Sequence, residues 1–257
     1  MWNAGHGFMA IWSDVAPGDS AFYHDWLLKE HFQERVSVPG FISARVFRRQ
    51  AGQDFQFFII YETESPEVLA SSAYVARLNN PTPMTQKVMP KLKNFVRGAG
   101  RVVQSSGVCG GGAAKVMRFE QPHALLSDAN ARTALFEKIN GMDRVLAVRL
   151  FEVDMAATTI QTEEKKIRTS KEEIYSQLLV IEAVDIDARP ADGIRVDRMS
   201  PAADAQSIGL GIAGLKFRDD LEAITTCSLK DLCGSDQAKV GSLVATVGAQ
   251  SLQFWGW

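Results

Sequence analysis

The stretch FISARVFRRQAGQDFQFFIIY, residues 41–61, decides the fold. Its first part, 41–49, alternates between two faces, which predicts a strand with two different sides. The AGQD run at 51–54 predicts a hairpin turn, and the strand after it, 55–61, is apolar at nearly every position. A strand that is apolar on both sides must be buried on both sides. We therefore expect helices on one face of this sheet and a second sheet on the other.

The elements around this hairpin follow the order β-α-β-β-α-β. The expected elements beside it are a strand at 8–15, a helix at 21–37, a helix at 65–78 and a strand at 95–104. Pro39-Gly40 ends the first helix, and Ser65 is a suitable N-cap for the second. This order is the ferredoxin-like one.

A glycine-rich run divides the chain. The sequence SSGVCGGGAA at 105–114 predicts a flexible linker, because three consecutive glycines favour neither helix nor strand. We therefore predict two domains, a ferredoxin-like unit at 1–107 and a divergent one at 108–257.

The second unit repeats the order of the first in part. Its expected elements are a strand at 113–120, a helix at 127–140, a strand at 145–153, a strand at 177–184 and a helix at 202–212. Asp128 or Ser127 is the expected N-cap of the helix at 127–140. The charged run EEKK at 163–166 predicts a solvated loop or hairpin tip. The fold class is therefore α+β, built from tandem ferredoxin-like (βαββαβ) units.

Several short motifs in the first unit occur together in one known superfamily. They are Trp26, Glu30-His31, Val38-Pro39-Gly40-Phe41, Tyr61-Glu62, Ser65-Pro66-Glu67-Val68-Leu69 and Asn80-Pro81-Thr82-Pro83. The segment resembles the dimeric α/β-barrel superfamily, and within it uncharacterised EthD-like and stress-responsive barrel proteins. The superfamily also includes cofactor-free monooxygenases and small lactone isomerases. The resemblance implies two ferredoxin-like units whose sheets pack face to face, here as an intrachain pseudo-dimeric α/β barrel.

Composition excludes several classes of function. Lys and Arg total 28 and Asp and Glu total 30, a net charge of −2, so nothing indicates nucleic acid or an anionic membrane as a partner. The three cysteines are an odd number with no metal-site spacing, as expected of free thiols in the cytoplasm. The N-terminus does not have the pattern of a signal peptide, and no apolar stretch is long enough to span a membrane. The sequence has no HExxH motif and no histidine pair four residues apart, so we expect no metal site.

His31 and Tyr61 are the candidate catalytic residues. The resemblance implies that His31 matches a recurrent histidine of the first helix, near the pocket. An imidazole titrates near neutrality and can move a proton. Tyr61 ends the buried strand, and its hydroxyl could act as the partner of His31 in acid/base chemistry. The alternative for His31 is a structural hydrogen bond between the helix and a loop.

Six further residues are candidates for ligand binding: Trp12, Trp26, Arg45, Phe47, Tyr74 and Asn80. The aromatic members would line a pocket, and an ordinary hydrophobic core is their alternative. Arg45 could hold a carboxylate bidentately, or lie at a solvated strand end or in an ion pair with Glu62. Asn80 could reach a ligand or end the preceding helix.

These features leave three functions open. The first is a cofactor-free enzyme of the oxygenase, isomerase or decarboxylase type that acts on a small apolar or aromatic metabolite. The second is a non-catalytic, ligand-binding or stress-related barrel, and the third is a haem-binding barrel. For a ligand we expect a cavity of a few hundred Å³ beside His31 and Tyr61. A homodimer could form through the sheet or through the apolar C-terminal FWGW at 254–257.

Overall fold

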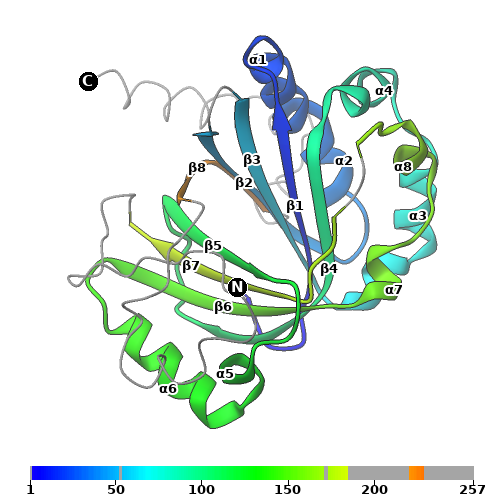
Figure 1. The fold of residues 1–257 in the computed structure, drawn as a ribbon. Coiled ribbons are helices and arrows are strands. Elements are labelled where there is room, and N and C mark those ends of the chain that lie inside the picture. The colour runs from blue at the N-terminus through cyan, green and yellow to red at the C-terminus, as the bar shows by residue number, and fades with distance from the viewer. Residues whose placement is uncertain (1, 52–53, 171–172, 185–219, 229–257) are drawn as a thin grey trace.

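The computed structural model describes residues 2–51, 54–170, 173–184 and 220–228. Eight strands in these ranges form one antiparallel, closed barrel in the order β1-β3-β2-β8-β5-β7-β6-β4 (Figure 1). They are β1 (Gly7–Val15), β2 (Phe41–Ala51), β3 (Asp54–Thr63), β4 (Lys93–Ser106), β5 (Ala113–Phe119), β6 (Val145–Val153), β7 (Gln177–Ala183) and β8 (Asp220–Ser228). Within each half, the order is β2-β3-β1-β4 for the first and, in the corresponding direction, β6-β7-β5-β8 for the second. Closure gives every one of these strands a neighbour on both sides.

The hairpin of β2 and β3 has the predicted double burial. The two strands pair antiparallel, with Phe47 opposite Phe58. Phe57 and Ile59 lie in the core between sheet and helices, whereas Phe58 lies in a separate core cluster. That second cluster contains residues of seven strands and none of a helix, so it fills the inside of the barrel.

The first helical layer covers the outer face of β1 to β4. It consists of α1 (Pro17–Trp26), the π-helical turn η1 (Leu27–His31), α2 (Phe32–Val36), the 3-10 helix η2 (Pro66–Ala70), α3 (Ser72–Leu78), α4 (Pro83–Val88) and the 3-10 helix η3 (Met89–Lys91). The single helix predicted at 65–78 is wrong, because Ser71 is extended and separates η2 from α3. Its hydroxyl accepts a hydrogen bond from the amide of Tyr74 and so begins a new helix.

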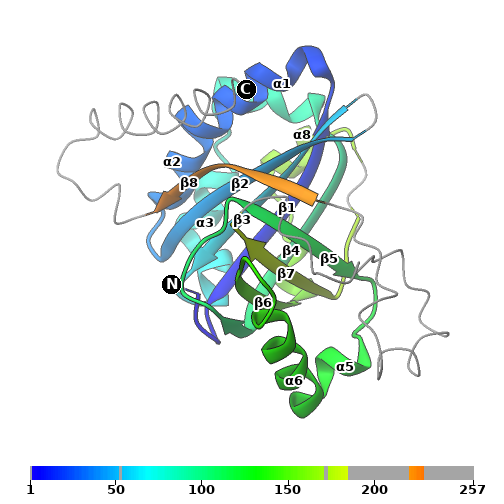
Figure 2. The ribbon, with the colours of Figure 1, turned by 90° about the vertical axis from the view of Figure 1, so that its left-hand side faces the viewer.

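The second helical layer lies on the opposite side of the barrel, over β5 to β7 (Figures 1 and 2). It contains α5 (Ala124–Ser127) and α6 (Ala129–Asn140). The carboxylate of Asp128 accepts a hydrogen bond from the amide of Ala131, which confirms a predicted N-cap. The predicted helix at 202–212 and the C-terminal FWGW lie outside the described residues.

The connection between β6 and β7 differs most from expectation. It contains α7 (Met155–Thr158) and α8 (Glu163–Ile167), so the predicted solvated loop at 163–166 is wrong. Glu164 is buried, and α8 lies beside α3 and α4 of the other half (Figure 1). A segment between two strands of the second half therefore covers part of the first.

The predicted flexible linker at 105–114 is largely structured. Its first two residues end β4 and its last two begin β5. The amide of Gly111 donates to Glu182 at 2.7 Å, and its carbonyl accepts from Arg45 at 2.6 Å. Gly107 has φ +82°, a conformation that favours glycine. Within the described ranges, no helix is long and apolar enough to cross a membrane.

Candidate functional site

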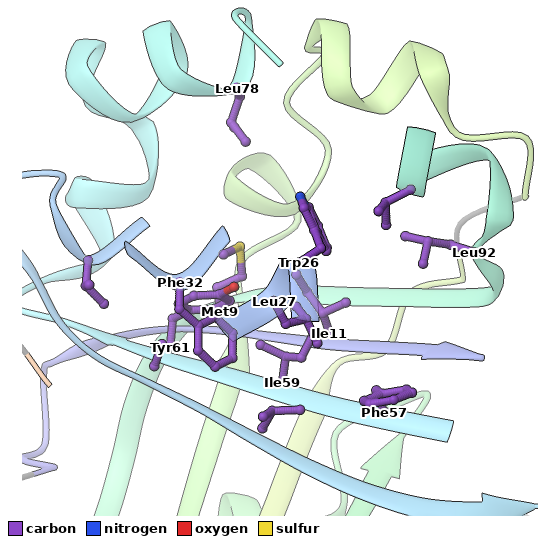
Figure 3. Packing of buried hydrophobic residues seen from close by; sticks show 14 of the residues in the cluster. Met9, Ile11, Trp26, Leu27, Phe32, Phe57, Ile59, Tyr61, Leu78 and Leu92 are labelled. Carbon is purple, nitrogen blue, oxygen red and sulfur yellow. The ribbon is translucent and has the colours of Figure 1, made fainter. Parts of the chain in front are cut away.

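A cavity of about 60 Å³ lies between the sheet and the first helical layer. Met9, Ile11 and Ile59 line it from the strands, and Trp26 and Leu27 line it from the helices. Figure 3 shows these side chains facing one another between the two layers. The cavity is smaller than the few hundred Å³ expected, and its volume corresponds to roughly four or five water positions.

The helix over this cavity contains the π-helical turn η1. The amide of Phe32 donates to the carbonyl of Leu27, five residues earlier. Leu27, His31 and Arg35 all line the cavity at intervals of four residues. π-Helical turns are rare and occur frequently at functional sites.

His31 is almost completely enclosed beside the cavity. Its side chain is 5% exposed, and its ring lies 4.2 Å from that of Trp26, measured between centroids. Burial, with a further contribution from the charge of Arg35, holds the pKa of His31 well below its usual 6.5. Its Nδ1 atom is buried and has no hydrogen-bond partner among the described residues. The imidazole is therefore neutral at neutral pH, and one ring nitrogen has a lone pair that a ligand could use.

Arg35 lies one helical turn after His31 and is 1% exposed. Its Nη2 donates to Oε1 of Glu164 in a buried ion pair. Burial opposes the charge of the guanidinium, but the Glu164 carboxylate, with smaller contributions from Tyr74 and Tyr61, outweighs this and the pKa of Arg35 is raised. The other terminal nitrogen, Nη1, is buried without a hydrogen-bond partner in the part of the chain that the structure describes.

Tyr61 lies next to His31 but does not line the cavity. The two ring centroids are 6.4 Å apart in an edge-on arrangement. Burial raises the pKa of Tyr61 well above 10, so its hydroxyl is protonated at neutral pH. That hydroxyl is buried and has no hydrogen-bond partner in the described ranges.

Two of the predicted ligand-binding residues line the same cavity. The indole Nε1 of Trp26 donates to Glu30 at 3.1 Å and to Thr85 at 3.3 Å. The hydroxyl of Tyr74 donates to the sulfur of Met9 at 3.1 Å. These bonds fix the orientation of both aromatic side chains at the cavity wall.

Three other predicted residues lie on the opposite side of the sheet, inside the barrel. The ring of Trp12 packs on Phe58 with a centroid distance of 4.6 Å. The guanidinium of Arg45 lies 4.7 Å from the ring centroid of Phe47 and forms a buried ion pair with Glu182. The sheet therefore separates these residues from His31.

Asn80, the last of the predicted residues, is exposed. Its side-chain amide donates to the carbonyl of Ala76 at 3.1 Å, in the last turn of α3. This bond ends the helix, which was one of the two expectations for Asn80.

Three buried, charged residues that line the cavity were absent from the sequence-based prediction. They are Arg35, Arg97 and Glu164. The four-residue spacing from His31 places Arg35 on the same helical face and could have identified it. For Glu164 no local pattern exists, since its partner lies 129 residues away.

The described residues contain no group of three His, Cys, Asp or Glu side chains that could hold a metal ion. The cavity also fits a haem poorly. Its volume of about 60 Å³ is far smaller than a porphyrin requires, and the Arg35–Glu164 pair occupies one wall.

No protein-family model matches the sequence, and no curated protein matches it. Solved structures do match its fold. A candidate monooxygenase from Fusobacterium nucleatum superposes with a TM-score of 0.53 at 10% identity, over 88% of this chain and 95% of that one. An anthrone oxidase-like protein gives a TM-score of 0.49 at 10% identity, over 87% and 93% of the two chains.

A chlorite dismutase from Candidatus Nitrospira defluvii gives a TM-score of 0.42 at 9% identity, over 96% of each chain. At such identities a structural match shows a shared fold and nothing more. Of these three matches, the one with the TM-score of 0.53 supports a shared fold. That structure covers most of both chains, so the antiparallel barrel described above is a fold that it shares with this chain.

Proposed function

We propose that the protein binds a small molecule in the cavity beside His31 and acts on it as a cofactor-free enzyme. The observation that carries this proposal is the state of His31. It is a neutral, buried imidazole at the wall of the cavity, and its Nδ1 has no hydrogen-bond partner among the described residues. An unsatisfied buried nitrogen costs about 1–3 kcal/mol, so a ligand that pairs with it gains a specific contact.

The chemistry proposed for His31 is proton transfer. The imidazole takes a proton from an acidic C–H or O–H group of the ligand and becomes an imidazolium, while the electron pair stays on the ligand. Isomerisation then needs only the return of that proton to another atom of the ligand. An oxygenase would instead use O₂ as the oxidant of the ligand anion. In a decarboxylase the bond to the carboxylate breaks, CO₂ leaves, and the imidazolium protonates the carbanion that remains.

Tyr61 is the proposed partner of His31. Its protonated hydroxyl has no hydrogen-bond partner within the described ranges, and its ring lies edge-on to the imidazole with a centroid distance of 6.4 Å. A ligand here would also contact Trp26 and Tyr74, which line the cavity. Binding roles for the barrel-interior residues Trp12, Arg45 and Phe47 would require a second ligand inside the barrel, and Asn80 would bind only at the surface.

We also propose that the barrel is an intrachain pseudo-dimer of tandem ferredoxin-like units, at 1–107 and 108–257. The corresponding strand orders of the two halves support this proposal. The EthD-like or stress-responsive kinship rests on the motifs of 26–85. A cytoplasmic location and a homodimer through the C-terminal aromatic residues are proposals of the same kind, and native mass spectrometry would test the dimer.

The experiment is native mass spectrometry of the purified protein for a retained small molecule, followed by turnover assays with small apolar and aromatic substrates. His31→Gln is expected to lower turnover by at least about 100-fold, the usual contribution of a positioned acid or base. His123→Gln, in the other half of the barrel, is the matched control and should leave turnover unchanged.

Equal turnover of the His31→Gln variant and the wild-type protein would reject the catalytic role. Binding that depends on His31, with no turnover of any substrate, would instead support the non-catalytic alternative. A Soret band after incubation with haem would support the haem-binding alternative, at a site other than this cavity.

A further inference from the structure

We propose that the ligand of this cavity is a small organic anion, namely a short-chain carboxylate whose charged end lies against Arg35 and whose apolar part lies against the β1 side chains. This inference rests on the proposed function and names the class of its ligand. Arg35 and His31 lie on one helical face and line the cavity, and each has a buried nitrogen without a hydrogen-bond partner in the described part of the chain.

The guanidinium of Arg35 has the geometry for this role. Its Nη2 is held by Glu164, which fixes the plane of the group, while the buried Nη1 has no hydrogen-bond partner in the described part of the chain. A buried N–H donor without an acceptor is unfavourable, and a charge-assisted hydrogen bond to a carboxylate is among the stronger ways to satisfy it.

A second buried guanidinium lines the same cavity. Arg97 of β4 is 9% exposed, and its Nη1 donates to the carbonyl oxygens of Ala157 and Thr158. Among the described residues it has no carboxylate within ion-pair distance. Carbonyl oxygens satisfy its hydrogen bonds but do not neutralise its charge, so the cavity has a positive wall that favours an anion.

The balance of charge along the lining points the same way. Its charged members are Arg35, Arg97, Lys165, Arg168 and Glu164. The guanidinium of Arg168 lies 3.8 Å from the ring centroid of Phe95. Among these described residues the one carboxylate is paired with Arg35, so it does not neutralise the buried guanidinium of Arg97.

Size and the remaining lining define the rest of the ligand. About 60 Å³ accommodates roughly four or five water positions, which corresponds to a molecule of about six non-hydrogen atoms or fewer. Met9, Ile11 and Ile59, from the strands, make the opposite wall apolar. A carboxylate with a short aliphatic part, such as butanoate, meets both conditions, and His31 then lies beside its carbon chain.

The test compares butanoate with butanamide, a neutral molecule of nearly the same shape, by calorimetric titration of the full chain. Butanoate is expected to bind at least tenfold more tightly. Arg35→Gln should weaken butanoate binding at least tenfold and leave butanamide unchanged. Arg101→Gln, which removes an exposed guanidinium paired with Glu152, is the control and should change neither affinity.

Glu164→Gln keeps an acceptor for Arg35 but removes the negative charge, and is expected to tighten butanoate binding severalfold. This variant also tests the preference for an anion if Arg35→Gln does not fold. Butanamide binding as tightly as butanoate, or Glu164→Gln weakening butanoate, would overturn the anion preference while the cavity remained a ligand site. If neither molecule binds, nor butan-1-ol, the proposed function fails as well.

Discussion

Arg35 of α2 and Glu164 of α8 form a buried ion pair between positions 129 residues apart in the sequence. The arginine belongs to the helix that carries His31, and the glutamate to the connection between two strands of the other half. The pair therefore fastens that connection over the cavity and holds one nitrogen of the guanidinium in place. Arg35 and Glu164 also contribute to the charge of the cavity wall that a ligand would contact.

Replacing Glu164 with Ala should be strongly destabilising, because it leaves the buried guanidinium of Arg35 without a counter-charge. We expect a loss of about 3–5 kcal/mol in the free energy of unfolding, measured by urea denaturation. Glu163→Ala is the control on the same helix. Glu163 forms an exposed pair with Lys166, and its removal should cost less than about 1 kcal/mol. Equal losses for the two variants would contradict the importance of burial.

Stability should fall as the pH drops below 6.5. The pKa of His31 is lower in the folded protein than in the unfolded chain, so the unfolded chain binds more protons at pH values between the two. The folded state therefore loses up to about 1.4 kcal/mol per pH unit below 6.5 from this group and is most stable above that pH. Burial also lowers the pKa of His24, so the effect of His31 is the difference between the wild-type protein and His31→Gln. Identical pH slopes for these two proteins would argue against a buried neutral imidazole.

Removing the hydroxyl of Tyr61 should not destabilise the protein. It is buried without a hydrogen-bond partner among the described residues, so Tyr61→Phe is expected to leave the unfolding free energy unchanged or to raise it by about 1 kcal/mol. Tyr23→Phe is the comparison, since the hydroxyl of Tyr23 shares a 2.8 Å hydrogen bond with Ser13, and its loss should cost about 1–3 kcal/mol. Reduced turnover of Tyr61→Phe at unchanged stability would show a role in the chemistry, whereas a large loss of stability would point to a structural hydrogen bond.

Gly107 should not tolerate a side chain. Its φ of +82° disfavours other residues, and a Cβ atom there would lie 2.0 Å from the carbonyl oxygen of Leu146. Gly107→Ala is expected to cost about 1–3 kcal/mol or more in thermal or urea unfolding. A Cβ atom at Gly18, in the first turn of α1, meets nothing within 4 Å, so Gly18→Ala should be neutral or slightly stabilising. A harmless Gly107→Ala would instead fit the flexible linker that the glycine run predicted.

Much of the fold followed from local pattern. The apolar strand at 55–61 required burial on both sides, and the structure covers it with helices and with the barrel interior. The β6 strand at 145–153 has the predicted bounds, and Asp128 caps α6 as expected. Period-two alternation, turn residues and capping chemistry act between neighbours in sequence, so the sequence alone is sufficient for them.

The tertiary structure alone decided which candidate residues meet. Alternation separates Trp12 from Ile11, but it does not say which face meets the helices and which the barrel interior, because both are apolar. The charged run at 163–166 predicted a solvated segment, because carboxylates are rarely buried without a partner. The partner of Glu164 is Arg35, which is remote in sequence and could not be identified from the run itself. The sequence by itself indicated seven of the eight described strands, but not β8, and the helices predicted at 21–37 and 127–140. The cavity, its guanidinium groups and its cover from the second half depend on contacts between distant segments that no local pattern encodes.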